Sequence, residues 1–284
     1  MALIPYNKPH ATGAQRVTHL RARGLIIPKP TIAARKIDLV GYERLRIYFL
    51  SRRQLNLVNH PFRPGTQYQE ILRLYACDIK LRDACFAAVG QFELLLRNAI
   101  SEALSASFGS HPYNNIAAFQ SPASALEAIQ TFTKTYELSK DPRAGHYKIT
   151  YCPPLLPPIW TMKEFLTFGK TVRLFNCLNN TLKQRIATQF GVPAHQVFSS
   201  WISCLVDLRN ICAHHDRLFN RSFQKQPATL TKVGLPVAPR HKLKAILECL
   251  DYLSDQRKAP VKITAKVGSI IRKFPEVAPA EVGF

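Results

Sequence analysis

Apolar side chains recur along most of this chain at the spacing of amphipathic helices. The run Leu25-Ile26-Ile27 resembles a strand, but it is too short and isolated to build a sheet. The pattern therefore predicts an essentially all-α protein. The expected helices cover residues 13–23, 31–39, 42–58, 67–107, 122–139, 161–178, 181–190, 194–220 and 239–255, with a short amphipathic helix at 261–273.

Capping residues mark where several of these helices begin. A Ser or Thr followed three residues later by Glu or Gln satisfies backbone N–H groups that a helix start leaves unpaired. Gly24 and Gly191 follow periodic segments and are expected helix stops. The expected starts are the capping boxes Thr12-Gly-Ala-Gln15, Thr161-Met-Lys-Glu164 and Thr181-Leu-Lys-Gln184, and the pair Ser121-Pro122.

The charge balance narrows the class of partner. Of 284 residues, 39 are Lys or Arg and 18 are Asp or Glu, which gives a formal net charge of +21. Solubility of a small domain needs a net charge of only about 2–8, so this excess favours a polyanionic partner. Charge alone does not separate RNA, DNA and an anionic membrane surface. The hydrophobic content of 46% is ample for a core.

We expect three segments: a basic helical arm at 1–40, a large helical domain at 41–255 and a basic C-terminal tail at 256–284. The arm has one acidic residue, Asp38, among many basic ones. An isolated run of like charge is more often a solvated surface, but the basic excess of the whole protein favours RNA contact here. The arm residues that we single out for this role are Lys8, Arg16, Arg21 and Arg23.

Nothing in the sequence indicates a membrane span, a metal site or a disulfide framework. The first residues lack a basic stretch followed by an apolar run, and no window approaches the roughly 18 apolar residues of a membrane span. The seven cysteines are scattered without a Cys-x-x-Cys pair, so we expect reduced, packed thiols. We therefore expect a soluble cytoplasmic protein that uses no metal and no cofactor.

The densest polar chemistry lies at residues 208–217, Leu-Arg-Asn-Ile-Cys-Ala-His-His-Asp-Arg, inside the helix expected at 194–220. Arg209 and His214 would lie about 140° apart on that helix, so they converge only on a target between them or with a facing element. An ion pair of Arg209 with Asp207 or Glu93 is the structural alternative. The helix would align Asn210, His214, Arg217 and Arg221 in one stripe. We expect Arg217 and Arg221 to contact RNA phosphates or to line the site.

Arg209, four intervening residues and His214 resemble the R-x(4–6)-H signature of HEPN domains, which are all-α nucleases and nucleotide-binding modules that usually dimerise. Such a spacing also occurs by chance, but an ordered set of segments extends the likeness. Together they resemble the Abi family, the Abi-like or AbiD/AbiF-type proteins of bacterial abortive infection, over most of residues 5–225. The segments are Phe92-Glu-Leu-Leu-Leu-Arg97-Asn98, His146-Tyr147, Pro157 to Gly169 and Asp207 to Asn220.

The resemblance implies an HEPN-like helical bundle in a phage-defence protein and, in some relatives, association with a small noncoding RNA. It implies RNA cleavage without a metal, in which the ribose 2′-OH attacks the adjacent phosphorus. His214 would be the general acid or base, Arg209 would stabilise the phosphoryl charge, and Asn210 would orient the histidine or the phosphate. The products would be a 2′,3′-cyclic phosphate and a 5′-OH. Because one histidine cannot be acid and base in one step, the resemblance implies a homodimer.

Several assignments stay open on the sequence alone. Glu93 and Arg97, four residues apart, could form a salt bridge within their helix, but we prefer a polar stripe of Glu93, Arg97 and Ser101 that faces the motif helix, so that Arg97 or Asn98 lines the same cleft. We expect Trp160 and Phe168 in the core. The alternative to a nuclease is a noncatalytic RNA-binding protein that forms a regulatory ribonucleoprotein, and a DNA-binding regulator is the weakest option.

Overall fold

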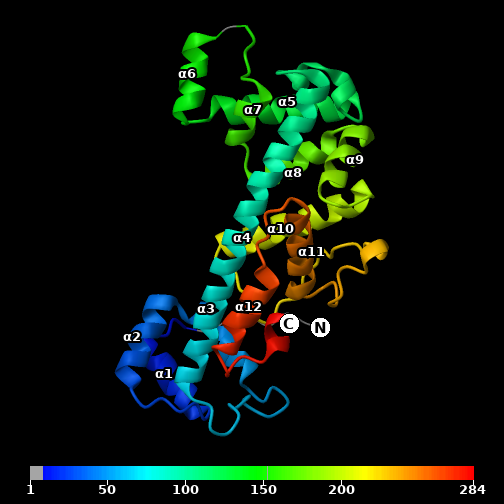
Figure 1. Ribbon diagram of the computed structural model, residues 1–284. Helices are drawn as coiled ribbons and strands as arrows, with labels where there is room; N and C mark the ends of the chain where they lie inside the picture. Colours follow the sequence, from blue (N-terminus) through cyan, green and yellow to red (C-terminus); the bar gives the residue numbers. More distant parts are fainter. Residues whose placement is uncertain (1–8, 152) are drawn as a thin grey trace, which may run out of the picture. The chain divides into compact units, whose positions relative to one another are not determined.

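The computed structural model describes residues 9–151 and 153–284, which form α-helices, short 3-10 segments and isolated β-bridges but no strand (Figure 1). The all-α prediction is confirmed. The helices are α1 (Gly13–Ala22), α2 (Pro30–Val40), α3 (Tyr42–Ser51), α4 (Tyr68–Phe108), α5 (Pro122–Glu137), α6 (Pro142–Thr150), α7 (Ile159–Met162), α8 (Phe168–Cys177), α9 (Asn180–Gln189), α10 (His195–Ala213), α11 (Leu243–Gln256) and α12 (Ile263–Arg272).

Two compact units divide the chain. Unit 1 comprises Met1–Lys80 and Ile271–Ala278, and unit 2 comprises Leu81–Ile270 and Pro279–Phe284. The boundary falls inside α4, so this helix contributes its first turns to unit 1 and the remainder to unit 2. The units group residues differently from the three segments expected from the sequence, because part of the basic tail packs with the N-terminal helices.

In unit 1, α1 and α2 pack against each other in opposite directions. Thr12 caps α1 with the expected capping box, and the N–H of Gly13 donates to Asp38 Oδ1, near the end of α2, at 2.8 Å. A Cβ at Gly13 would lie 2.4 Å from the carbonyl oxygen of Ala34, so the close approach requires glycine. The one acidic residue of the basic arm therefore joins its two helices.

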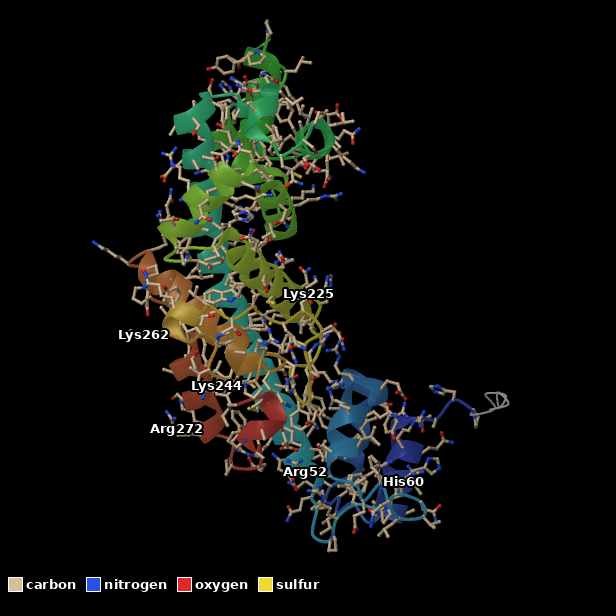
Figure 2. The ribbon with its side chains drawn as sticks, turned by 90° about the vertical axis from the view of Figure 1, so that its right-hand side faces the viewer. Arg52, His60, Lys225, Lys244, Lys262 and Arg272 are labelled. Carbon is tan, nitrogen blue, oxygen red and sulfur yellow. The ribbon has the colours of Figure 1, made fainter. Side chains whose placement is uncertain are left out.

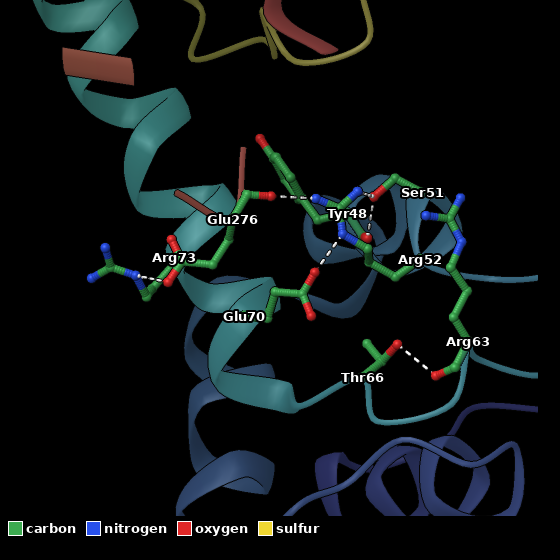
Figure 3. A network of polar contacts seen from close by, with 8 residues as sticks. All are labelled: Tyr48, Ser51, Arg52, Arg63, Thr66, Glu70, Arg73 and Glu276. Atoms are coloured by element: carbon green, nitrogen blue, oxygen red, sulfur yellow. Dashed lines mark hydrogen bonds and ion pairs between the residues drawn. The ribbon is translucent and has the colours of Figure 1, made fainter. Parts of the chain in front are cut away.

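The helix expected at 42–58 ends at Ser51, because the next two arginines turn into the interior of unit 1. Arg52 and Arg53 are only 7% and 9% exposed. Arg52 donates to the Glu70 carboxylate at 2.5 Å and to the backbone carbonyl oxygen of Glu276 at 2.6 Å (Figure 3). Arg53 lies over the ring of Phe62, and burial lowers the pKa of its guanidinium. A continued helix could not bury both arginines in these places.

Unit 2 has an aromatic core formed by α4, α8, α10 and the end of α9. Phe92 of α4 packs edge-on against Phe168 and Phe190, and Phe198 of α10 contacts Phe190. Phe168 is buried as expected. The prediction for Trp160 is wrong, because this side chain is 51% exposed on the short helix α7, whose buried residues are Ile159 and Met162. The aromatic core fixes α10, which carries the polar motif.

Other helices also differ from the sequence prediction. The helix expected at 161–178 is interrupted, and α8 begins after the cap Thr167. Thr181 is likewise not a cap, because the side chain of Asn179 accepts a hydrogen bond from the N–H of Leu182 in the first turn of α9. The helix α6 was missed, although Asp141 followed by proline is a typical helix start. Asn179 and Thr181, two positions apart, are competing caps, and the capping-box pattern selected the wrong one.

Every cysteine that the structure describes is buried and free of disulfide bonds. In residues 9–151 and 153–284, no group of three His, Cys, Asp or Glu side chains is arranged to hold a metal ion. None of the helices in these ranges combines the length and apolar character that crossing a bilayer requires.

Candidate functional site

The polar motif lies at the C-terminal end of α10 in unit 2. The helix ends at Ala213, not at residue 220, so His214 is its C-cap residue, with φ −86° and ψ 8°. The next residue, His215, has a left-handed backbone with φ 56°. His214 and His215 are both exposed to solvent. The predicted extension of this helix is wrong because the chain reverses at His215.

Two backbone hydrogen bonds close the end of α10. The N–H of His215 donates to the carbonyl oxygen of Cys212 at 3.1 Å, and the N–H of Asp216 donates to that of Ile211 at 2.9 Å. This pair of bonds is a Schellman motif, in which glycine is the commonest left-handed residue. Histidine occupies that position here, so His215 sets the direction in which the chain leaves His214.

Arg217 and Arg221 lie beyond the helix and not in a stripe with His214. The Arg217 guanidinium donates to the carbonyl oxygens of Phe219 and Asn220, the second at 2.6 Å. Arg221 donates to the carbonyl oxygen of Arg217 at 3.1 Å. The expected stripe is therefore wrong, because the helix that would align it has already ended. These two arginines hold the turn that follows the motif.

Arg209 is partly exposed on α10 and packs on an aromatic ring of α4. Its guanidinium carbon lies 5.7 Å from the ring centroid of Phe86, and its Nη1 makes a long 3.4 Å hydrogen bond to Asn210 Oδ1. The two carboxylates considered as its partners bind other cations. Asp207 accepts from Lys225 at 2.8 Å, and Glu93 pairs with Arg97. Across residues 9–151 and 153–284, no carboxylate forms an ion pair with Arg209.

Arg97 and Asn98 do not lie beside Arg209. Arg97 is held by Glu93 with its side chain 15% exposed, and Asn98 accepts a hydrogen bond from Lys163. Arg209 covers Phe86, and Arg97 lies about 16 Å further along α4 than Phe86, at about 1.5 Å per residue. The salt bridge within the helix is therefore the correct reading of Glu93 and Arg97. Within unit 2, the surface that faces Arg209 is Phe86.

The basic residues selected in the N-terminal arm belong to unit 1. Arg16 lies over Tyr42, with its guanidinium carbon 4.3 Å from the ring centroid, whereas Arg21 and Arg23 are exposed. Lys8 lies outside the described residues. Basic side chains also occur well beyond the arm, in both units. Figure 2 labels Arg52, His60 and Arg272 of unit 1 and Lys225, Lys244 and Lys262 of unit 2.

The thiols near the motif are not nucleophiles. Burial raises the pKa of Cys204 on α10 to about 12, and the nearby Asp207 adds to the shift. Cys212, inside the motif, is also buried. A thiol with such a raised pKa is not a thiolate at neutral pH. The groups that the motif presents to solvent are therefore imidazole, guanidinium, amide and the carboxylate of Asp216.

Sequence reasoning missed two residues that define the surroundings of Arg209. Phe86 is one of many apolar residues of α4, and no spacing rule connects it with a residue of α10. Lys225 follows the turn that ends the motif. A helix continuing to residue 220, as expected from the sequence, would have placed Lys225 far from Asp207. One signal was available: residues two apart on a helix do not face each other, so Asp207 is a poor partner for Arg209.

Comparison with known proteins places the chain in a family. The sequence profile of the Abi-like proteins matches residues 35–220, which is more than half of the chain and includes the whole motif. The chain belongs to the Abi-like protein family, and this membership supports a role in abortive infection. Comparison with curated proteins and with solved structures gives no match.

Proposed function

We propose that this protein acts in abortive infection as a cytoplasmic, metal-independent endoribonuclease. Arg209, Asn210 and His214 form its active site, and a homodimer brings two such motifs together as an HEPN-type site. The substrate is RNA, and a small noncoding RNA assists or regulates the protein. No metal and no cofactor takes part in this chemistry.

The observation that carries the proposal is that Arg209, within the part of the chain that the structure describes, has no carboxylate partner and is held by an aromatic ring. Its two candidate carboxylate partners are occupied by Lys225 and Arg97, and its guanidinium rests on the face of Phe86 at the surface. A cation held by an aromatic ring keeps its donors available for an anion, and a planar guanidinium matches two phosphate oxygens. The net charge of +21 would draw RNA toward such a site.

The chemistry needs one proton acceptor and one proton donor. An imidazole takes the proton of the ribose 2′-OH as its oxygen bonds to phosphorus, and a second group gives a proton to the departing 5′-oxygen. His214 performs one of these transfers, and His214 of a second copy performs the other. Arg209 stabilises the charge on the phosphoryl oxygens, and Asn210 orients the histidine or the phosphate. The strand is left with a 2′,3′-cyclic phosphate and a 5′-OH.

A noncatalytic RNA-binding protein is the second candidate. The observation in its favour is that Arg209 and His214 diverge on α10 and that Phe86, not a second acid or base, faces Arg209. A regulatory ribonucleoprotein would need only the basic surface. In this case the motif grips RNA without cutting it.

A paired assay in cells separates the two functions. Wild type, His214→Ala, Arg209→Ala and the control Arg240→Ala are expressed, and phage plating, toxicity and the ends of co-purified RNA are measured. Arg240 is an exposed arginine of unit 2 outside the motif. A nuclease predicts that both motif variants lose protection and toxicity, and that cyclic-phosphate ends disappear while RNA still co-purifies. Protection and toxicity unchanged by His214→Ala would overturn the nuclease and favour binding alone.

A further inference from the structure

A cavity of about 490 Å³ lies between α5, α6 and the segments around them in unit 2, and it shares no residue with the motif on α10. Small-molecule sites typically measure about 300–1,000 Å³. The Arg209 contact on α4, at Phe86, lies about 33 Å before the C-terminal end of this helix at about 1.5 Å per residue. The residues that line the cavity, between positions 113 and 156, all follow that end in the sequence and lie on or beside α5 and α6. The cavity is therefore a separate site.

Aromatic rings line this cavity. Tyr113, Tyr136 and Tyr151 contribute to its wall together with leucine and proline side chains. Tyr151 is 52% exposed and stands at the rim, whereas Tyr113 and Tyr136 are buried. Such a wall offers flat apolar faces to a flat ligand, and base–aromatic stacking contributes about 1–3 kcal/mol per base.

One cation lines the cavity among its described residues. The ammonium of Lys148 on α6 donates to the backbone carbonyl oxygen of Glu137 at 3.1 Å and lies 4.9 Å from the ring centroid of Tyr136. One acceptor leaves two further donors of this ammonium available. Lys148 is therefore held beside the tyrosine wall with donors to spare for an anionic oxygen.

A buried hydroxyl of the wall has no partner. Tyr113 donates to the carbonyl oxygens of Leu156 and Pro157, so its hydroxyl is satisfied. Tyr136 is only 5% exposed, and its buried hydroxyl has no hydrogen-bond partner in the described ranges. Leaving such a group unpaired costs about 1–3 kcal/mol. The hydroxyl is closed off from solvent in the free protein, so a ligand atom recovers that loss when the ring shifts to meet it.

We propose that this cavity binds a nucleotide: a heteroaromatic base against the tyrosine rings, with its phosphate on Lys148. The amide of Asn114 and the carboxylate of Glu137 also line the cavity, and such groups accept from and donate to base edges. The bound group is either a free nucleotide or an unpaired nucleotide within an RNA strand. The site stands independently of the proposed nuclease, because it uses none of the residues of the motif.

Binding is measured by calorimetry with AMP, adenosine, ribose 5-phosphate and an adenylate octanucleotide. His214→Ala protein is used, so that cleavage does not interfere. Lys148→Gln is expected to weaken AMP about tenfold and to leave adenosine nearly unchanged. Tyr151→Ala is expected to weaken AMP and adenosine alike, by about fivefold or more. The matched controls are Lys134→Gln on α5 and Ile149→Ala on α6, which are exposed and outside the cavity.

Tyr136→Phe adds a test that separates ligand contact from structure. Because the hydroxyl is buried without a hydrogen bond in the free protein, the variant should unfold at a midpoint no lower than that of its parent and bind AMP about fivefold more weakly. An octanucleotide that binds about tenfold more tightly than AMP identifies an RNA strand as the source, and equal affinity identifies a free nucleotide.

Three results would overturn the proposal: no binding of either AMP or the octanucleotide, equal affinity of AMP for the Lys148→Gln, Tyr151→Ala and parent proteins, or binding of an apolar dye that no nucleotide displaces. The last result would assign the cavity to an apolar ligand. None of these results bears on cleavage at Arg209 and His214.

Discussion

The guanidinium of Arg209 on α10 lies over the ring of Phe86 on α4, with its central carbon 5.7 Å from the ring centroid. The ring is 43% exposed, so the contact is at the surface of unit 2. This contact explains how Arg209 keeps a defined position without a carboxylate partner. An arginine neutralised by a carboxylate would be a weaker ligand for phosphate, and Asp207 is instead bound by Lys225.

A double-mutant cycle tests this contact. Phe86→Leu, Arg209→Gln and the double variant are expected to give a coupling energy of about 0.5–1 kcal/mol in the free energy of unfolding, as for exposed cation–π pairs. Urea unfolding measures it. Phe86→Leu combined with Lys225→Gln should be additive, because Lys225 pairs with Asp207 and not with the ring. Coupling energies that do not differ between the two cycles would mean that Arg209 is not positioned by Phe86.

The left-handed backbone of His215 gives a second prediction. Asparagine tolerates this conformation and valine does not, so His215→Val should lower the free energy of unfolding by about 1–2 kcal/mol relative to His215→Asn. The valine variant should also lose RNA cleavage, because a changed turn at residue 215 would shift the end of α10 and with it the imidazole of His214. Urea unfolding and a cleavage assay measure the two effects. Equal stability and equal activity of the variants would show that the turn does not position His214.

The buried network of unit 1 predicts a contrast between two arginines. Arg52 is 7% exposed and holds Glu70 and the backbone of Glu276 (Figure 3). Arg52→Met leaves a partly buried carboxylate without its partner and should destabilise the protein by about 3 kcal/mol. Arg46→Met, which breaks the exposed pair with Glu43, should cost about 0–0.5 kcal/mol. Urea unfolding followed by circular dichroism compares them, and similar losses would contradict a structural role for the network.

The cap of α6 predicts a pH dependence. Hydrogen bonds from the side chain and backbone of Arg143 lower the pKa of the Asp141 carboxyl to about 2. The folded pKa lies below the unfolded value of about 3.9, so the carboxylate stabilises α6 fully above about pH 4 and loses this effect as the pH falls through about 2. An NMR titration of the Asp141 carboxyl measures the midpoint. Arg143→Gln should raise it toward about 3.9, and a wild-type midpoint already near that value would refute the interaction.

Much of the helical architecture could be predicted from the sequence, because local rules decide it. The start of α1 follows from the capping box of Thr12 and Gln15, and its end follows from Gly24, which has φ 88°. Local rules also made α6 predictable from Asp141 and Pro142, although it was missed. Helix starts with a strong cap and stops with glycine need no tertiary information.

The surroundings of the motif on α10 and the end of α3 depend on features that local sequence rules do not mark. The end of α10 was misplaced because the left-handed residue of its Schellman motif is His215 and not glycine. The buried Arg52 and Arg53 ended α3 through tertiary contacts with Glu276 and Phe62, which periodicity does not encode. The pairing of Arg209 with Phe86 likewise arises from the packing of α10 against α4. Arg97, in contrast, could be paired with Glu93 from their spacing alone.

The most direct test of the account is RNA cleavage by the purified protein in EDTA, with analysis of the product ends. We predict that wild type and the control His215→Asn release 2′,3′-cyclic phosphate and 5′-OH ends. His214→Ala and Arg209→Ala should lose about 100-fold or more of the rate while remaining folded, as expected for loss of an acid–base group or of charge stabilisation. Cleavage that requires a divalent metal, or that persists in either variant at the wild-type rate, would contradict the proposed mechanism.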